Sequence, residues 1–297
     1  MTLDAIRTVA VLGAGTMGNG IAHVFARSGY NVILRDVETR FLDSAIATIA
    51  KNLDREVKKG KVPEGDKSKI LSRIHTTTDI SEIARANFAV EAVPERLDLK
   101  LSVLREADKL LPPEVILASN TSSISMTTLA AATSRPDRFV GMHFMNPVPV
   151  MILIEVIRAL QTSDETFRTT MALCEKLEKK PVAVNDAPGF VSNRVLMPMI
   201  NEAAFAVMEG VATAEAVDAV MKLGMNHPMG PLELADLIGL DTCVSILDVL
   251  YTGFGDSKYR ACPLLRKMVA AGWLGRKSGR GFFNYAGWDQ LAANGPR

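Results

Sequence analysis

One glycine-rich segment constrains the fold of this chain more than any other feature of its sequence. Residues 9–20 read VAVLGAGTMGNG, in which Gly13, Gly15 and Gly18 fit the pattern G-x-G-x-x-G. The apolar start of the segment is long enough for a strand buried on both faces. Apolar residues at helical spacing follow the glycines as far as Gly29, a plausible residue to end a helix. The glycines therefore lie between a strand and a helix.

A second apolar run completes the pattern. Residues 31–34 predict a second strand, and Asp36 follows it, 18 residues after Gly18. Strand, glycines, helix, strand and acid in this order predict a Rossmann-type dinucleotide-binding domain. A carboxylate at Asp36 would accept from a ribose 2′-hydroxyl and repel a 2′-phosphate, which favours NAD over NADP, although Arg35 and Arg40 lie nearby.

Each glycine has a separate task in such a loop. Gly13 permits the tight turn, Gly15 lets the backbone approach a pyrophosphate, and Gly18 lets the helix pack on the strand. Thr16 and Met17 at the helix start are expected to line the same site, where free N–H groups attract phosphates. Two alternatives remain at this point: FAD as the dinucleotide, and a tight turn that binds nothing.

The alternation of strands and helices continues beyond the first hundred residues. It predicts an open, mostly parallel sheet with helices on both faces, and ligands in such sheets bind beyond the carboxyl ends of strands. Asn120, Ser122 and His143 lie at or just after predicted strand ends. The predicted strands are 88–93, 115–118, 139–144, 153–157 and 182–184, and the predicted helices are 97–110 and 164–177.

Residues 51–75 form a basic segment with eight lysines and arginines against four acids. The pattern suits a helical hairpin that projects from the sheet. A solvated charged face is one interpretation. A clamp for a phosphate-bearing substrate is the other.

After residue 185 the pattern of strands stops. We therefore predict two domains, a dinucleotide-binding domain over 1–185 and an all-helical domain over 186–297. Helices are predicted over 190–210, from Thr213 onward, and over 232–250. The faces of this second domain are rich in Met and Val, so we expect a homodimer; packing on the first domain is the alternative.

Composition excludes several classes of protein. The net charge of +1 gives no field that would recruit nucleic acid or an anionic membrane. No apolar stretch is long enough to span a bilayer. Cys174, Cys243 and Cys262 are widely spaced and have no metal-ligand pattern, so we expect reduced thiols in a cytoplasmic protein and no metal site.

A histidine and an acid stand out in the apolar stretch 142–156, MHFMNPVPVMILIEV. His143 and Glu155 have two interpretations. They are either polar groups satisfied within the core, or a general base with the carboxylate that orients it. Their spacing alone does not show that they touch.

The full set of motifs resembles a known family. VLGAGTMGNGIA, SNTSS, HFMNPVPVM, DAPGFVSNRV, LGMNHPMGPLELADLIGLD and GRKSGRGFFNY occur in this order along essentially the whole chain. Together they resemble the 3-hydroxyacyl-CoA dehydrogenases, and the length resembles the single-function bacterial 3-hydroxybutyryl-CoA dehydrogenases. The resemblance implies reversible hydride transfer between C3 of an (S)-3-hydroxyacyl-CoA and NAD.

The resemblance also implies roles for individual residues. His143 aligns with the family's catalytic base and Glu155 with its partner carboxylate; Ser122 aligns with the serine that hydrogen-bonds the substrate 3-oxygen. Asn193 aligns with the asparagine that holds the histidine and the substrate. The residues that the resemblance places around the nicotinamide half of the cofactor are Glu95, Lys100, Asn120, Ser122, Asn146 and Lys277.

The chain departs from the family at Ile152, where many relatives carry a lysine. Residues 51–75 align loosely with the family's coenzyme A-binding helix pair, so no single lysine is matched to a phosphate. Two rival functions stay open. One is another NAD dehydrogenase acting on a hydroxy acid or sugar acid, which would commonly use a lysine base; the other is a structural protein such as the lens crystallins recruited from this family.

Overall fold

The computed structural model describes residues 2–285, and the contacts divide the chain into two compact units, Met1–Ala187 and Pro188–Arg297. The sequence pattern places the boundary after residue 185. The last twelve residues of the expected second domain, 286–297, lie outside the described part.

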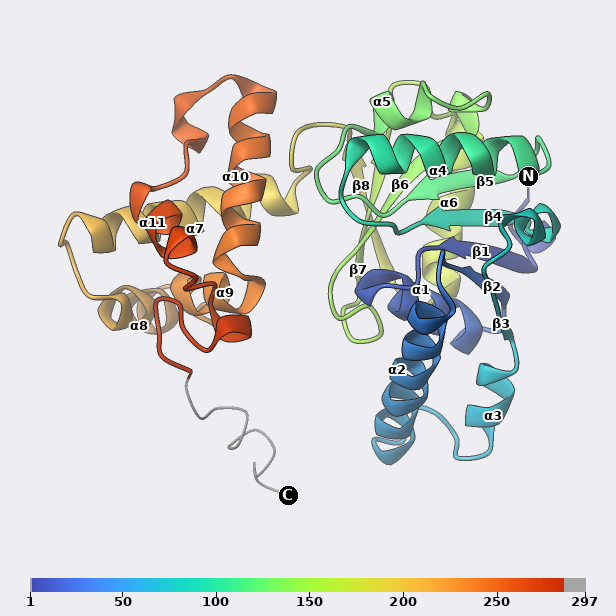
Figure 1. Cartoon of the computed structure of the whole chain (residues 1–297), viewed down its shortest axis with the longest axis horizontal. Helices are drawn as coiled ribbons and strands as arrows, with labels where there is room; N and C mark the ends of the chain where they lie inside the picture. Colours follow the sequence, from blue (N-terminus) through green and yellow to red (C-terminus); the bar gives the residue numbers. More distant parts are fainter. Residues whose placement is uncertain (1, 286–297) are drawn as a thin grey trace. The chain divides into compact units, whose positions relative to one another are not determined.

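The first unit is built on an eight-stranded sheet with the strand order β3-β2-β1-β4-β5-β6-β7-β8 (Figure 1). The strands are β1 Thr8–Leu12, β2 Asn31–Arg35, β3 Ile74–Thr77, β4 Phe88–Glu91, β5 Ile116–Ser119, β6 Phe139–Phe144, β7 Leu153–Arg158 and β8 Lys180–Asn185. The helices are α1 Thr16–Arg27, α2 Thr39–Lys58, α3 Asp66–Leu71, α4 Leu97–Leu110, α5 Met126–Ala130 and α6 Asp164–Lys176, with short 3-10 turns at Leu3–Ala5, Ile80–Arg85 and Pro136–Arg138. The predicted fold class is confirmed.

The sheet is parallel at every pairing except that of β6 with β7. The reason is the length of the connection. Only residues 145–152 separate the two strands, and a parallel crossover needs a dozen residues or more. β7 therefore turns back beside β6 as a hairpin partner.

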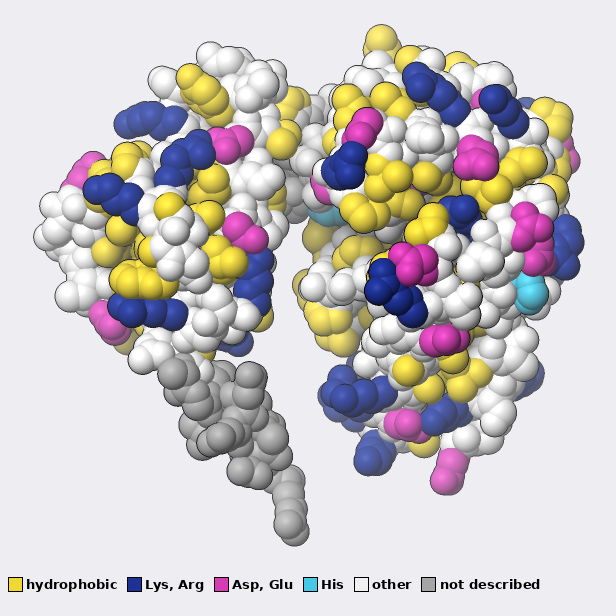
Figure 2. All heavy atoms as spheres, in the orientation of Figure 1, with side chains coloured by type: hydrophobic (Ala, Val, Ile, Leu, Met, Phe, Trp, Pro, Cys, Tyr) yellow, Lys and Arg dark blue, Asp and Glu magenta, His cyan; other side chains and the backbone are white. Residues whose placement is uncertain are grey.

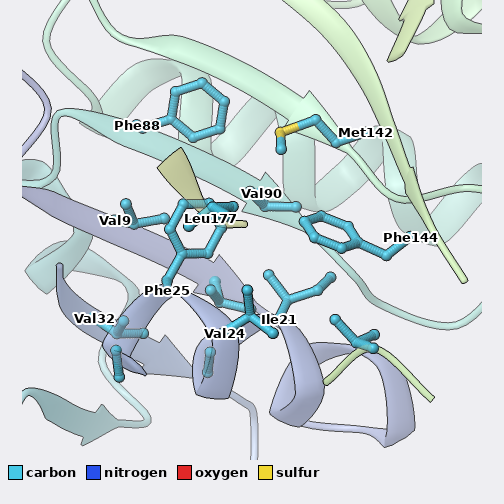
Figure 3. Packing of buried hydrophobic residues seen from close by; sticks show 14 of the residues in the cluster. Val9, Ile21, Val24, Phe25, Val32, Phe88, Val90, Met142, Phe144 and Leu177 are labelled. Atoms are coloured by element: carbon cyan, nitrogen blue, oxygen red, sulfur yellow. The ribbon is translucent and has the colours of Figure 1, made fainter. Parts of the chain in front are cut away.

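One hydrophobic core of this unit is formed by the sheet and several helices, among them α1 and α6, which are distant in sequence. Phe25 on α1 and Leu177 at the end of α6 belong to one buried cluster with Val9 and Val90 from the central strands (Figure 3). Every residue of β4 is buried, as expected for a strand covered on both faces. The sequence of β4, FAVE, is apolar except for Glu91.

The prediction for the basic segment 51–75 is confirmed except at its end. The segment does form the predicted helical hairpin, made by α2 and the short α3, but it ends in a strand, β3, that the sequence pattern did not predict. Only Thr77 of β3 is buried, because β3 lies at the edge of the sheet. Its sequence, IHTT, holds one apolar residue, so it lacks the alternating or continuous apolar pattern by which strands are recognised.

The second unit consists of helices in the part that the structure describes. They are α7 Ser192–Met208, α8 Ala214–Gly224, α9 Pro231–Ile238, α10 Leu240–Phe254 and α11 Pro263–Ala270, with 3-10 turns at Ser257–Tyr259 and Arg276–Ser278. Met197, Leu232, Leu247 and Leu265 share its buried core. Thr213 caps α8 by accepting a hydrogen bond from the N–H of Ala216, as a threonine at that position predicts.

The prediction of one helix over 232–250 is wrong. The helix is interrupted at Gly239, whose backbone φ of 103° is one that residues with a Cβ rarely adopt. α9 ends and α10 begins at this residue. In the sequence the glycine was visible, but an isolated glycine is tolerated within a helix pattern.

No helix among residues 2–285 combines the length and the apolar character that a membrane crossing requires.

Candidate active site

The glycine loop and the acid after β2 are joined directly. One carboxylate oxygen of Asp36, Oδ2, accepts a hydrogen bond of 2.6 Å from the N–H of Ala14, and the other accepts one of 2.7 Å from the N–H of Val37. The main-chain N–H of Gly13 donates to the carbonyl of Arg35 at 2.8 Å. The loops that follow β1 and β2 are therefore held together at the carboxyl edge of the sheet.

The three glycines differ in what surrounds them. A Cβ on Gly13 would lie 2.7 Å from the carbonyl oxygen of Ala92, and its φ is +108°. A Cβ on Gly18 would lie 1.8 Å from the carbonyl oxygen of Gly13. At Gly15 nothing lies within 4 Å of that position. The fold itself thus requires glycine at the first and third positions, whereas at Gly15, the cap of α1, the protein leaves open space beside a helix N-terminus.

His143 and Glu155 form a buried pair. They are direct partners in the antiparallel register of β6 and β7, and the distance between Nδ1 of the histidine and Oε2 of the glutamate is 2.8 Å. The histidine is 8% exposed and the glutamate 2%. A carboxylate on Nδ1 fixes the ring orientation and favours the tautomer with the proton on that nitrogen.

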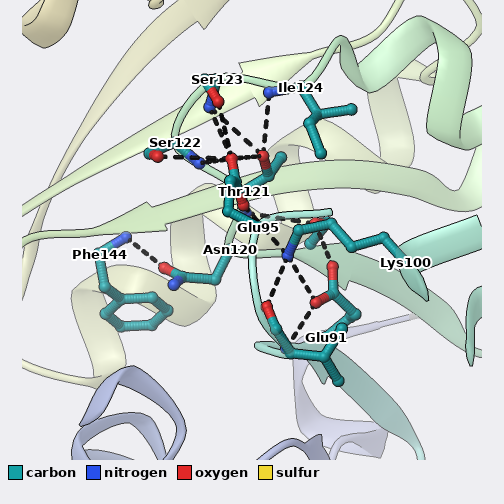
Figure 4. Close-up of polar contacts among 11 residues, drawn as sticks. Glu91, Glu95, Lys100, Asn120, Thr121, Ser122, Ser123, Ile124 and Phe144 are labelled. Atoms are coloured by element: carbon teal, nitrogen blue, oxygen red, sulfur yellow. Dashed lines mark hydrogen bonds and ion pairs between the residues drawn. The ribbon is translucent and has the colours of Figure 1, made fainter. Parts of the chain in front are cut away.

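Glu95 organises the loop after β5 (Figure 4). Its Oε1 accepts hydrogen bonds from the N–H of Ser122 at 3.0 Å, from the N–H of Ser123 at 3.1 Å and from the hydroxyl of Thr121. Burial acts to raise the pKa of Glu95, but the charge of Lys100 and these hydrogen bonds outweigh it and lower the pKa below its ordinary value. Glu95 is therefore a carboxylate at neutral pH.

Lys100 is almost completely buried, at 1% exposed, and it lies between two acids. Its Nζ is 2.7 Å from Oε1 of Glu91 and 3.3 Å from Oε2 of Glu95, and it donates to the carbonyl of Val93 at 3.0 Å. The ammonium thus connects the end of β4 with the loop that Glu95 holds, as Figure 4 shows.

Asn120 extends the same assembly toward the histidine. Its Oδ1 accepts a hydrogen bond of 2.9 Å from the N–H of Phe144, the residue after His143 in β6. Glu95, Lys100, Asn120 and Ser122, which the family resemblance assigns to one site, therefore come together in the structure. Glu91 was not predicted; the signal that could have found it is a single acid in the apolar run FAVEAV, the same kind of signal that singled out Glu155.

Ser122 precedes α5, whose N-cap is Ser125; the side chain of Ser125 accepts from the N–H of Thr128. Asn146 lies exposed in the connection between β6 and β7. Asn193 and Lys277 belong to the second unit. Asn193 is buried in the first turn of α7, and Nζ of Lys277 lies 2.5 Å from Oδ1 of Asp241.

The hairpin of α2 and α3 exposes most of its basic side chains, which gather at its end in Figure 2. The exposed members are Lys51, Arg55, Lys58, Lys59, Lys61 and Lys69. Lys67 instead pairs with Asp54 at 2.5 Å, and Arg73 donates to the carbonyl of Ala26. Within residues 2–285 no three His, Cys, Asp or Glu side chains are grouped so that they could hold a metal ion.

The fold and this site define a class. The family described as 3-hydroxyacyl-CoA dehydrogenase, NAD binding domain, matches residues 8–187, and its C-terminal domain matches residues 189–285. The chain belongs to the 3-hydroxyacyl-CoA dehydrogenase family. This confirms the predicted family, the enzyme class and NAD as the cofactor.

Individual relatives are similar over nearly the whole chain. A probable 3-hydroxybutyryl-CoA dehydrogenase of Bacillus subtilis is 55% identical, with 94% of this chain and 98% of the relative covered. The 3-hydroxybutyryl-CoA dehydrogenase of Bradyrhizobium diazoefficiens is 54% identical, with coverage of 95% and 96%. The crystal structure of (S)-3-hydroxybutyryl-CoA dehydrogenase from Ralstonia eutropha is similar with a TM-score of 0.92 and 53% identity, over 94% of this chain and 99% of that one.

Proposed function

We propose that this protein interconverts (S)-3-hydroxybutyryl-CoA and acetoacetyl-CoA, as a short-chain member of its family. The observation that carries the proposal is the buried pair of His143 and Glu155 at the carboxyl edge of the dinucleotide-binding sheet. The names of the similar proteins from Bacillus, Bradyrhizobium and Ralstonia support the short acyl chain.

In this proposal His143 is the general acid and base. Oxidation of an alcohol by hydride loss requires removal of the O–H proton, and an imidazole can accept it near neutral pH. With Nδ1 directed at Glu155, Nε2 is the nitrogen that takes the proton. The carboxylate stabilises the imidazolium that results, as in the serine-hydrolase triad. In the reductive direction the imidazolium returns the proton to the forming alkoxide.

Ser122 and Asn193 complete the proposed catalytic set. The Ser122 hydroxyl would hydrogen-bond the substrate 3-oxygen, and its loop is fixed for this purpose by Glu95. Asn193 would hold the histidine and the substrate from α7. Both roles rest on the alignment with the family motifs SNTSS and DAPGFVSNRV.

The cofactor would be held along the carboxyl edge of the sheet. The open space at Gly15 fits a pyrophosphate at the N-terminus of α1, beside Thr16 and Met17. Asp36, which follows β2, would accept a hydrogen bond from the adenosine ribose. The bound dinucleotide supplies the hydride acceptor or donor. Around its nicotinamide half we place Glu95, Lys100, Asn120, Ser122, Asn146 and Lys277.

The basic face of the hairpin is the proposed site for the phosphates of coenzyme A. Its exposed lysines and arginine lie on one projecting element (Figure 2). Clustered cations attract a polyanionic substrate and accelerate its association.

The decisive experiment follows NADH absorbance with acetoacetyl-CoA, beside free acetoacetate and beside NADPH. Fast NADH oxidation with the thioester, and slow oxidation in both other reactions, would support the reaction, the need for the coenzyme A handle and the cofactor. Longer 3-ketoacyl-CoAs would then define the chain length. NADH binding without turnover of any thioester would refute the proposed activity.

We also propose a cytoplasmic homodimer. All three cysteines are free and buried, as expected for a reducing compartment. On α8, Val220 is 61% exposed and Leu223 87%, an apolar surface that a subunit interface would cover. Analytical ultracentrifugation of the wild type and of Leu223→Glu tests the dimer; a monomeric wild type would refute it.

A further inference from the structure

The least explained group near the proposed nicotinamide site is Glu91, the last residue of β4. Its side chain is fully buried, at 0% exposed, although a carboxylate is costly to bury unless its charge is compensated and its oxygens are hydrogen-bonded. The reaction proposed above gives Glu91 no chemical step. Its contacts show what it does instead.

Both oxygens of the Glu91 carboxylate are occupied by protein groups. Oε1 accepts from Nζ of Lys100 at 2.7 Å and from the N–H of Val93 at 2.7 Å. Oε2 accepts from the hydroxyl of Ser119 at 2.6 Å. The carboxylate therefore fixes three things at once: the Lys100 ammonium, the start of the loop after β4, and the end of β5.

The main chain of Glu91 makes a parallel connection. Its carbonyl accepts a hydrogen bond of 2.8 Å from the N–H of Asn120, whose side chain in turn accepts from Phe144. Glu91, Lys100 and Glu95 form a row of alternating charge (Figure 4). Removing the first charge leaves the buried ammonium with Glu95 as its one remaining acidic partner within the described network.

We propose that Glu91 is a positioning residue for the nicotinamide half of the cofactor. It acts through Lys100 and through the loops that carry Glu95 and Asn120, without touching the cofactor itself. This rests on the proposed placement of the nicotinamide beside Lys100. It predicts that Glu91 matters for the nicotinamide half and is neutral for the adenosine half, which is held at the glycine loop and Asp36.

Two ligands separate these halves. NADH carries both, whereas ADP keeps the adenosine and the pyrophosphate and lacks the nicotinamide and its ribose. In Glu91→Gln the charge is lost and the shape kept, so we expect NADH affinity to fall roughly tenfold or more, the usual scale for a hydrogen bond to a charged group. ADP affinity should stay within about twofold. Titration of the full-length protein measures both.

Glu56→Gln is the matched control. Glu56 is also a buried carboxylate in this unit, 8% exposed and paired with Arg27 at 2.9 Å, but it lies on α2 away from this network. We expect it to lower thermal stability and to leave the ratio of NADH to ADP affinity unchanged. An equal loss of both ligands in Glu91→Gln, or no loss of NADH, would overturn the proposal.

Ser119→Ala provides a second variant that keeps every charge in place, and it covers the case in which Glu91→Gln does not fold. Losing the hydroxyl that donates to Oε2 of Glu91 should lower the affinity for NADH severalfold and leave the affinity for the adenosine half unchanged. An unchanged NADH affinity would count against the proposal. A double-mutant cycle adds Lys100→Met: because Glu91 acts in part through Lys100, Glu91→Gln should cost less in that background than in the wild type. Additive losses would overturn the proposal. These are binding measurements, so they stand even where acetoacetyl-CoA is not turned over.

Discussion

His143 and Glu155 lie directly opposite each other on the antiparallel strands β6 and β7, with Nδ1 2.8 Å from Oε2. In an antiparallel pair such partners project from the same face of the sheet and their side chains meet. The pairing therefore converts a separation of twelve residues in sequence into a contact. The contact satisfies both polar groups within the core, and their role as a general base with its orienting carboxylate stays a prediction.

Replacing His143 with glutamine removes the base and keeps a polar side chain of similar reach. General acid–base catalysis contributes about 10²–10⁴-fold, so we expect kcat/KM with acetoacetyl-CoA to fall by that factor. NADH affinity, measured by fluorescence titration, should stay near the wild-type value. A loss of turnover below tenfold would remove His143 from the proposed mechanism.

Asp36→Ala is expected to weaken NADH binding and to narrow the gap between NADH and NADPH. The variant loses the acceptor for the ribose and also the acceptor for the N–H of Ala14, so part of the glycine loop is released. Because the carboxylate repels a 2′-phosphate, NADPH should lose less affinity than NADH. Binding constants for both cofactors test this; an unchanged ratio would contradict the role of Asp36.

Gly15→Ala and Gly18→Ala should fail in different ways. At Gly15 nothing within 4 Å obstructs a Cβ, so we expect a loss of less than about 1 kcal/mol in stability but a large loss of NADH affinity. At Gly18 a Cβ would collide with the carbonyl of Gly13, which should cost about 1–3 kcal/mol as well as binding. Thermal melts beside NADH titrations measure the contrast, and normal NADH binding by Gly15→Ala would refute the pyrophosphate placement.

The buried Lys179 should make the stability of the protein depend on pH in the alkaline range. It is 6% exposed, and its Nζ donates to the carbonyls of Val148 at 2.6 Å and Met151 at 2.7 Å. Burial, and after it the charge of Arg27, lowers the pKa of Lys179 to about 8. Between that value and an unfolded pKa of about 10.4 the unfolded chain binds more protons, so the contribution of Lys179 to stability rises with pH across this window.

Lys179→Met lacks this titration. As pH rises from 8 to about 10.4, we expect the free energy of unfolding of the wild type to increase relative to that of the variant by about 2 kcal/mol. Below about pH 7 the difference between the two should be constant. Denaturant unfolding at several pH values measures it, with Lys176→Met, which alters an exposed lysine, as the control. A difference that does not change above pH 8 would contradict the lowered pKa.

Many helices and strands of the first unit could be predicted from the sequence, because most of its strands are buried. β6 and α4 have the predicted bounds, since continuous apolar runs and helical periodicity are strong local signals. β3 was missed because its sequence, IHTT, holds one apolar residue, whereas β8, the other edge strand, carries the apolar run that predicted it. The break at Gly239 was missed because it depends on a backbone conformation, φ 103°, that glycine permits but does not require.

Part of the candidate site was likewise predictable from the sequence and part was not. The glycine loop and Asp36 were predictable from spacing, because they depend on local order along the chain. The contact of His143 with Glu155 was not, since it depends on strand direction; the short connection between β6 and β7 held that information. The network around Glu95 and Lys100 unites loops from β4 and β5, and no local pattern encodes such a meeting.

The hairpin formed by β6 and β7 also decides which insertions and deletions the protein can tolerate. Both members of the proposed acid–base pair come from the continuous segment 139–158, so changes of length elsewhere in the chain leave their pairing intact. One residue added within either strand would slip the register, and the slipped side chain would turn to the opposite face of the sheet. Length variation is therefore expected in the hairpin of α2 and α3 and at loop ends, while the spacing within each of these two strands stays fixed.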